Sequence, residues 1–213
     1  MKFGVIGSGI VGKTLSAGLL KHGHEVTIGT RDAGKLAAWA KENPKAKVAG
    51  VAEAAIFGQA VILAVNGSVA SEALKAAGAA NLAGKTVIDA CNPIAEGAPV
   101  DGVVKFFTSL DNSLMERLQR DFPEAHFVKA FNSVGAALMI DPKFKEGKPT
   151  MFICGNDEGA KKAVGGIIEQ FGWETADMGK ASAARAIEPL CMLWLIPGLS
   201  RNQWGHAFKL LRQ

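Results

Sequence analysis

Lys2-Phe3-Gly4-Val5-Ile6-Gly7-Ser8-Gly9-Ile10-Val11-Gly12-Lys13-Thr14, near the start of the chain, matches two phosphate-binding patterns at once. Residues 7–12 form the G-x-G-x-x-G of a dinucleotide site, and residues 7–14 also satisfy the G-x-x-x-x-G-K-[ST] of a P-loop. In both, a strand ends at glycines that let the backbone approach a phosphate, and the next helix presents free N–H groups to the anion. The flanking sequence has to decide between them.

The segment after the glycines favours the dinucleotide pattern. A short helix is expected from about 10 to 21 and a second strand from 25 to 29, which closes a strand–helix–strand unit of roughly 30 residues, as the dinucleotide fingerprint requires. Lys13 would then face solvent on the first helical turn. A P-loop NTPase or kinase stays as a third alternative, because the strand at 86–89 ends at Asp89, which could hold Mg²⁺.

The end of the second strand indicates which dinucleotide would bind. An acidic residue there takes the ribose 2′-hydroxyl of NAD, whereas an Arg accommodates the 2′-phosphate of NADP. Here Thr30 occupies the strand-end position and Arg31 is the next residue, with Lys35 in the following turn, and these side chains suit a dianionic phosphate. Asp32 is the exception, and we interpret it as the N-cap of a helix that begins near Ala33.

Composition limits the class of protein. The 213 residues are 48% apolar and 21% charged, which is typical of a globular chain and long enough for one ordinary domain. The net charge of +4 comes from scattered Lys and Arg without a basic, aromatic-rich run, so we predict no nucleic-acid partner and interpret the excess as attraction for an anionic cofactor. Three widely spaced cysteines predict no disulfide framework and no metal site, and they favour a reducing, cytoplasmic location.

No membrane partner is expected either. The first strand begins by residue 3, which predicts no signal peptide. The longest apolar stretch, 190–199, is too short to span a bilayer and is interrupted by Pro197-Gly198. We interpret it as a core or interface element.

Strands and helices alternate along the rest of the chain. Further strands are expected at 46–49, 60–65, 86–90, 126–130, 149–155 and 173–176, and helices at 51–57, 68–77 (with Ser68 as N-cap), 113–120, 158–170, 181–195 and 202–211. This alternation predicts an α/β fold, a doubly wound and mostly parallel sheet of the Rossmann type. Residues 1–213 form a single dinucleotide-binding domain in this interpretation, with 181–213 as a helical tail.

Ligands of such sheets lie across the carboxyl ends of the strands, and three of these ends carry asparagine: Asn66, Asn92 and Asn132. Asparagine is also a favoured turn residue, so each alone fits a simple turn, whereas together they suggest contacts with the cofactor. The predicted cofactor-binding residues are Gly7, Ser8, Gly9, Ile10, Val11, Gly12, Thr30, Arg31, Lys35, Ala64, Val65, Asn66, Asn92, Pro93, Ala130 and Asn132. No nucleophile motif or metal-ligand spacing is found, so no catalytic side chain and no metal are predicted.

Three later segments carry a resemblance: Lys129-Ala130-Phe131-Asn132-Ser133-Val134, Cys154-Gly155-Asn156-Asp157 and Arg185-Ala186-Ile187-Glu188-Pro189-Leu190. With the glycine loop and Gly29-Thr30-Arg31, they make essentially the whole chain resemble the NADPH-dependent reductases related to coenzyme F-420 (deazaflavin):NADP oxidoreductase. The resemblance implies an NADP(H) site at 7–12 and 30–31 and a homodimer. It also implies an acceptor pocket beside the nicotinamide, roofed by the loop after Asn92 and by the C-terminal helix.

The function expected from this resemblance is NADPH-dependent hydride transfer to a flavin-like, deazaflavin or other small conjugated acceptor. Hydride passes directly between two rings, so the protein contributes alignment and electrostatics and needs little acid–base chemistry. The alternative is an NADPH-binding sensor or partner module without turnover. Its glycine loop and Arg31 would look the same, so only turnover with an added acceptor separates the two.

Overall fold

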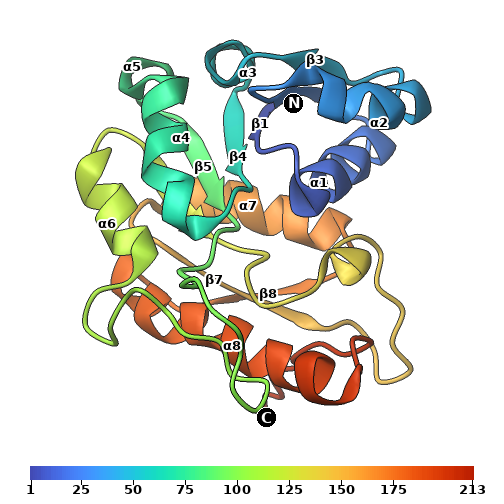
Figure 1. The fold of residues 1–213 in the computed structure, drawn as a ribbon, viewed down its shortest axis with the longest axis vertical. Helices are drawn as coiled ribbons and strands as arrows, with labels where there is room; N and C mark the ends of the chain where they lie inside the picture. The colour runs from blue at the N-terminus through green and yellow to red at the C-terminus, as the bar shows by residue number, and fades with distance from the viewer.

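The computed structural model describes residues 1–213, and one eight-stranded sheet runs through its centre (Figure 1). The strands are β1 (Lys2–Ile6), β2 (Glu25–Gly29), β3 (Lys47–Ala49), β4 (Ala60–Leu63), β5 (Thr86–Asp89), β6 (His126–Lys129), β7 (Thr150–Gly155) and β8 (Glu174–Asp177). Their order is β3-β2-β1-β4-β5-β6-β7-β8. All neighbours pair in parallel except β6 and β7, which are antiparallel. The predicted doubly wound, mostly parallel α/β fold is confirmed.

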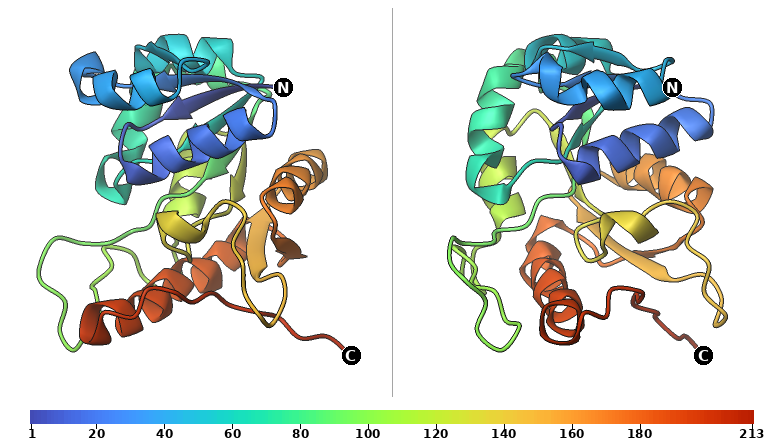
Figure 2. Two further views of the ribbon diagram at one scale, coloured as in Figure 1. Left: turned by 90° about the vertical axis from the view of Figure 1, so that its right-hand side faces the viewer. Right: turned by 45° about the vertical axis from the view of Figure 1, so that its right-hand side comes forward.

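Helices cover both faces of the sheet. They are α1 (Ile10–Lys21), α2 (Ala37–Glu42), α3 (Val51–Phe57), α4 (Ala70–Ala77), α5 (Ala79–Leu82), α6 (Leu114–Asp121), α7 (Glu158–Gln170) and α8 (Ala184–Arg201), with short 3-10 turns η1 (Ala33–Leu36), η2 (Gly67–Val69), η3 (Ala136–Leu138) and η4 (Ala181–Ala183). Figure 2 shows α1 (blue) and α7 (orange) on one side and α4 and α6 (green) on the other.

The period of two along each strand divides the apolar side chains between two buried cores. Val5 and Ile62 face the core under α1 and α7, whereas Ile6 and Leu63 face the core under α4 and α6. Because β2 lies on one side of β1 and β4 on the other, the strand order reverses between β1 and β4. Their carboxyl ends form the switch point at which such sheets bind ligands.

Two predicted helix starts have different outcomes. Asp32 does cap η1, because its Oδ1 accepts the Gly34 N–H at 3.0 Å. The prediction that Ser68 caps the helix after β4 is wrong. Asn66 is the cap, since its Oδ1 accepts from the backbone N–H and the hydroxyl of Ser68, both at 3.0 Å, and this ties the chain into η2 before α4 begins.

The C-terminal helix is longer than predicted. The sequence suggested a break at Pro197-Gly198, but α8 continues to Arg201, because an internal proline removes one backbone donor without ending the helix here. Gly198 is a packing site, since a Cβ at this position would lie 2.2 Å from the ring of Trp204. None of the helices, α8 included, has the length and apolar character that crossing a membrane requires.

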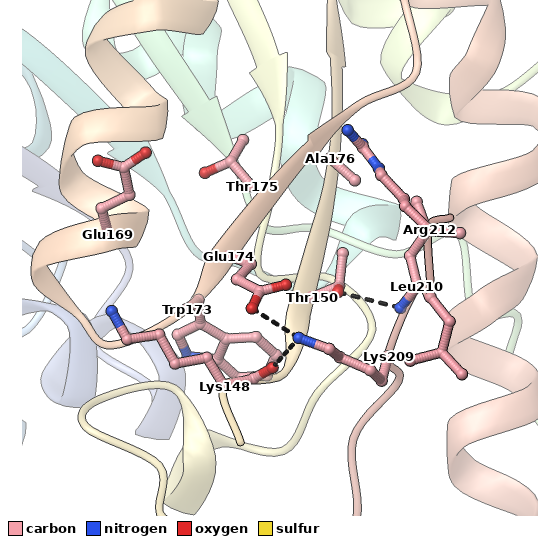
Figure 3. Close-up of a pocket in the computed structure, with 11 residues that line it drawn as sticks. Lys148, Thr150, Glu169, Trp173, Glu174, Thr175, Ala176, Lys209, Leu210 and Arg212 are labelled. Atoms are coloured by element: carbon pink, nitrogen blue, oxygen red, sulfur yellow. Dashed lines mark hydrogen bonds and ion pairs between the residues drawn. The ribbon is translucent and has the colours of Figure 1, made fainter. Parts of the chain in front are cut away.

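The predicted helix at 202–211 is wrong. Asn202 takes a left-handed φ of 54° and ends α8, and the residues after it form no regular helix. The segment instead bonds to the sheet. The Thr150 N–H donates to the Phe208 carbonyl at 2.9 Å. The Leu210 N–H donates to Thr150 Oγ1 at 3.0 Å, as Figure 3 shows. These backbone groups therefore find partners without helix formation.

Candidate cofactor-binding site

The glycine loop between β1 and α1 has the geometry of a phosphate cradle. Gly7 has a φ of +127°, and a Cβ there would lie 2.1 Å from the Ala64 carbonyl oxygen; a Cβ on Gly12 would lie 2.0 Å from the Gly7 carbonyl oxygen. A Cβ on Gly9 would meet nothing within 4 Å. Gly7 and Gly12 thus permit close backbone packing, whereas Gly9 leaves open space in front of α1, whose first N–H groups have no side-chain cap. An anionic dinucleotide fits this cradle.

Alanine at Gly12 should therefore reduce stability, whereas alanine at Gly9 should reduce the affinity for NADPH. Gly12→Ala forces a Cβ against backbone and should lower the free energy of unfolding by about 3 kcal/mol. Gly9→Ala should change it by less than about 0.5 kcal/mol, because Gly9 has an ordinary φ of −75°, yet weaken NADPH by about tenfold or more by filling the cradle. Urea unfolding and calorimetric titration measure the two quantities. Unchanged NADPH affinity in Gly9→Ala would contradict the cradle.

A cleft of about 540 Å³ opens beside this loop, between the end of β2, η1 and α4. It gathers six of the predicted residues: Gly7, Ser8, Thr30, Arg31, Lys35 and Val65. Eight lining residues were not predicted: Ile6, Gly29, Asp32, Val51, Val69, Glu72, Ala73 and Ala76. Val69, at the end of η2, and Ala73 and Ala76 of α4 follow the spacing of one helix face, which is the signal that would have found this wall.

The rim of the cleft carries two cations, Arg31 and Lys35, and two carboxylates, Asp32 and Glu72, of which Glu72 is ion-paired with Lys75 at 2.7 Å. Arg31 and Lys35 are exposed and form no ion pair or side-chain hydrogen bond within the chain, and the carboxylate between them, Asp32, is engaged with the Gly34 N–H. Thr30 Oγ1 lies 3.1 Å from Ser8 Oγ and joins the end of β2 to the glycine loop. Two free cations next to a phosphate cradle suit a ligand that carries a second phosphate.

The other predicted residues lie outside this cleft. Ile10 is 70% exposed at the start of α1, and Val11 is half-buried. Ala64, Pro93 and Ala130 are buried. Asn66 is exposed and caps its own turn, as described above, so the simpler turn interpretation accounts for it. A cofactor contact for these residues stays a prediction.

Asn92 and Asn132 contact one another at the carboxyl ends of β5 and β6. Asn92 Nδ2 donates to the Asn132 carbonyl at 2.7 Å, and Asn132 Nδ2 donates to Asn92 Oδ1 at 3.2 Å and to the Ile187 carbonyl at 3.0 Å. Asn92 is half-buried and Asn132 is buried, with its Oδ1 lacking a donor. This pair thus joins two strand ends to α8.

Sequence reasoning missed a buried charge cluster below this pair. Lys129 Nζ lies 2.7 Å from Asp89 Oδ2 and 3.1 Å from Glu188 Oε1, and it donates to the Cys91 carbonyl at 2.9 Å. Burial opposes the charge on Lys129, but the two carboxylates outweigh burial and hold its pKa above the ordinary value. The only sequence signal was a lysine that directly follows the apolar pair Phe127-Val128 of β6.

This cluster removes the argument for a P-loop. Asp89 is fully buried, and its Oδ1 accepts the Cys91 N–H at 2.9 Å while its Oδ2 faces Lys129. A carboxylate held in this way is not available to a hydrated Mg²⁺ at the surface. The dinucleotide interpretation of the glycine loop is therefore the one that the structure supports.

Glu188 also fixes the start of α6. Its two carboxylate oxygens accept the N–H groups of Leu114 and Met115, each at 2.9 Å. A second contact joins the same helices nearer the surface, where the Arg185 guanidinium donates to both oxygens of Glu116 at 2.8 to 3.1 Å. α6 and α8 are thus held together by one buried and one half-buried carboxylate.

The Arg185–Glu116 contact predicts a pH dependence. The hydrogen bond from Arg185 is the main cause that lowers the pKa of Glu116 from 4.5 to about 2. Because the folded pKa is depressed, the contact stabilises the protein fully above the ordinary pKa and is lost as pH falls toward about 2. Thermal unfolding of wild type and Arg185→Gln should therefore differ at neutral pH and converge as the pH falls below about 4. A difference independent of pH would contradict this assignment.

A larger cavity, of about 650 Å³, lies elsewhere, between β8 and the C-terminal segment (Figure 3). Lys209 crosses it, ion-paired with Glu174 at 2.6 Å and bonded to the Lys148 carbonyl at 2.8 Å. It has neither a glycine loop nor the start of a helix, and it lies away from the switch point. We therefore assign it to the packing of the C-terminal segment rather than to cofactor binding.

The fold and the switch-point cleft define a nucleotide-binding α/β domain of the Rossmann class. The family model "NADP oxidoreductase coenzyme F420-dependent" matches residues 2–93, and the chain belongs to this family of NADP-dependent oxidoreductases. A solved structure of a proposed F420-dependent NADP-reductase from Arthrobacter sp. FB24 has a TM-score of 0.93 and 36% identity, with both chains covered completely. The predicted family resemblance is confirmed.

Other proteins that are similar to this chain carry different names. The metalloreductase STEAP3 of Rattus norvegicus is 30% identical over 203 residues, which are 93% of this chain and 38% of that protein. The chain thus spans little more than a third of this curated relative. An imine reductase from Streptomyces aurantiacus, with a TM-score of 0.68 and 18% identity over 93% of this chain and 63% of its own, shares the fold alone.

Proposed function

We propose that this protein binds NADP(H) in the switch-point cleft and passes hydride between it and a flavin-like, deazaflavin or other small conjugated acceptor. The observation that carries the proposal is the meeting of the glycine cradle with Arg31 and Lys35 in one cleft. Membership of an NADP oxidoreductase family supports the cofactor. The name of the Arthrobacter relative supports a deazaflavin among the acceptors to be tested.

In this proposal each part of the cleft has one task. The loop around Gly9 and the N–H groups of α1 hold the pyrophosphate, and Arg31 and Lys35 hold the 2′-phosphate. The apolar face of α4 borders the adenine side of the cleft. When bound, the nicotinamide supplies the hydride; the protein contributes orientation and exclusion of water, without a side-chain acid or base.

Calorimetric titration of the purified protein with NADPH, NADH and Mg²⁺-ATP tests the binding. We expect NADPH to bind at micromolar strength, NADH weakly and ATP not at all. NADPH oxidation with added flavins and deazaflavin then tests turnover. Tight NADPH binding without turnover on any acceptor would favour a sensor, and preference for NADH would overturn the role of Arg31.

We also propose a homodimer, which the family resemblance implies. Exposed apolar side chains on α8 and on the loop before α6 support it: Leu193 is 55% exposed and Leu110 is 77% exposed. Sedimentation equilibrium should give twice the 22.3 kDa chain mass. A cytoplasmic location is part of the same proposal, supported by three buried cysteines that are all free thiols.

A further inference from the structure

The contacts among β5, β6 and α8 form a closed ring. Glu188 pairs with Lys129, which donates to the Cys91 carbonyl, and the next residue, Asn92, exchanges hydrogen bonds with Asn132. Asn132 donates to the carbonyl of Ile187, the neighbour of Glu188. The ring therefore starts and ends at α8, and it passes through both asparagines that follow the two strands.

Glu188 is the member of this ring whose negative charge needs hydrogen-bond donors. It is 1% exposed, and its negative charge is matched by Lys129 and by two backbone N–H groups of α6. Each of its oxygens therefore faces donors only. A glutamine has the same shape but places an NH₂ group on one side, where it would meet an ammonium or an N–H group instead of accepting from it.

The backbone beside the ring is also held in an unfavourable conformation. Phe131, between Ala130 and Asn132, is buried and has a φ of 60° in the left-handed region. Such a conformation in a bulky residue persists only where the surroundings enforce it, and it is frequent at functional sites. It turns the chain directly before Asn132, the residue that closes the ring.

We propose that the nicotinamide half of the cofactor lies at the carboxyl ends of β5 and β6, across the switch point from Arg31, and that Glu188 is a positioning residue that fixes the Asn92–Asn132 pair there through this ring. The inference rests on the proposed function. In this inference different parts of the protein hold the two halves of the cofactor. The residues that line the adenine-side cleft lie at or before Ala76, and none of them belongs to the ring. Loss of the Glu188 charge should therefore disturb the nicotinamide half alone.

The affinities of Glu188→Gln for two ligands distinguish an effect on the nicotinamide half of the site from an effect on the adenine half. Adenosine 2′,5′-bisphosphate contains only the adenine half of NADPH, and its Kd should stay within about twofold of wild type. The Kd of NADPH should rise by about five- to tenfold, the loss expected of about one hydrogen bond. The fluorescence of the bound reduced nicotinamide should move toward that of free NADPH.

Two further variants sharpen the result. Arg185→Gln breaks a contact between α6 and α8 that lies outside the ring, so both Kd values should stay within about twofold of wild type. Asn92→Ala opens the ring at a half-buried residue and should repeat the selective loss even if Glu188→Gln does not fold. Equal weakening of both ligands, or no weakening of either, in the folded variants overturns the inference. Wild-type protein that binds neither ligand overturns the proposed function and the inference with it.

Discussion

Lys129→Met should lower the free energy of unfolding by about 3 to 5 kcal/mol. The methionine is one atom shorter than the lysine and leaves Asp89 and Glu188 buried without a counter-charge, and an uncompensated buried charge is strongly destabilising. For a chain of this size the melting temperature should fall by roughly 6 to 20 °C. Differential scanning calorimetry at neutral pH measures the change.

Lys161→Met is the matched control. Lys161 is also a buried lysine with two carboxylate partners, Glu158 and Asp177, but these partners are 82% and 42% exposed. Water can solvate them after the lysine is lost, so we expect a loss of less than about 1 kcal/mol. Similar losses in the two variants would mean that the Lys129 cluster is solvated and does not act as a buried cluster.

Arg31→Ala should weaken NADPH by about 10- to 150-fold and leave NADH nearly unchanged. The expected range follows from a charge-assisted hydrogen bond of roughly 1.5 to 3 kcal/mol to the 2′-phosphate. Because Arg31 is exposed and forms no ion pair within the chain, its loss should not affect folding. Calorimetric titration with the two dinucleotides measures the difference.

The control for Arg31→Ala removes a cation far from the cleft. Arg212 lines the other cavity, so Arg212→Ala lowers the net charge equally without touching the switch point. Its NADPH affinity should stay within about twofold of wild type. Equal losses of NADPH and NADH in Arg31→Ala would instead place Arg31 at the shared part of the two cofactors and remove the basis for NADP preference.

Local patterns were sufficient for most of the fold. Every strand was predicted within a few residues, because buried parallel strands are continuous apolar runs bounded by turn residues. Apart from the helix cap assigned to Ser68 in place of Asn66, the errors lie at the C-terminus. Pro197-Gly198 has the local signal of a helix end, but Gly198 is required by the Trp204 ring, and the segment after Asn202 is fixed by Thr150, which is remote in sequence.

The site residues also fall into those that local sequence patterns predict and those that they do not. The glycine loop and Arg31 could be predicted because one continuous strand–helix–strand unit brings them together. For the wall beside α4 the only sequence signal is the helical spacing of Val69, Ala73 and Ala76, and the Lys129 cluster could not be predicted, since it depends on contacts between distant elements. Lys129 and Glu188 are 59 positions apart in the printed sequence, and neither spacing nor composition indicates that they pair.

The ring of hydrogen bonds has a consequence for synthesis on the ribosome. All residues that line the adenine-side cleft lie between Ile6 and Ala76, whereas the ring closes only through Ile187 and Glu188. Because chains emerge from the N-terminus, we expect the two halves of the site to mature at different times. Ribosome-bound chains stalled before α8 should bind adenosine 2′,5′-bisphosphate, but should not bind whole NADPH more tightly than this adenine half. If stalled and completed chains show the same preference for NADPH, this order of maturation is contradicted.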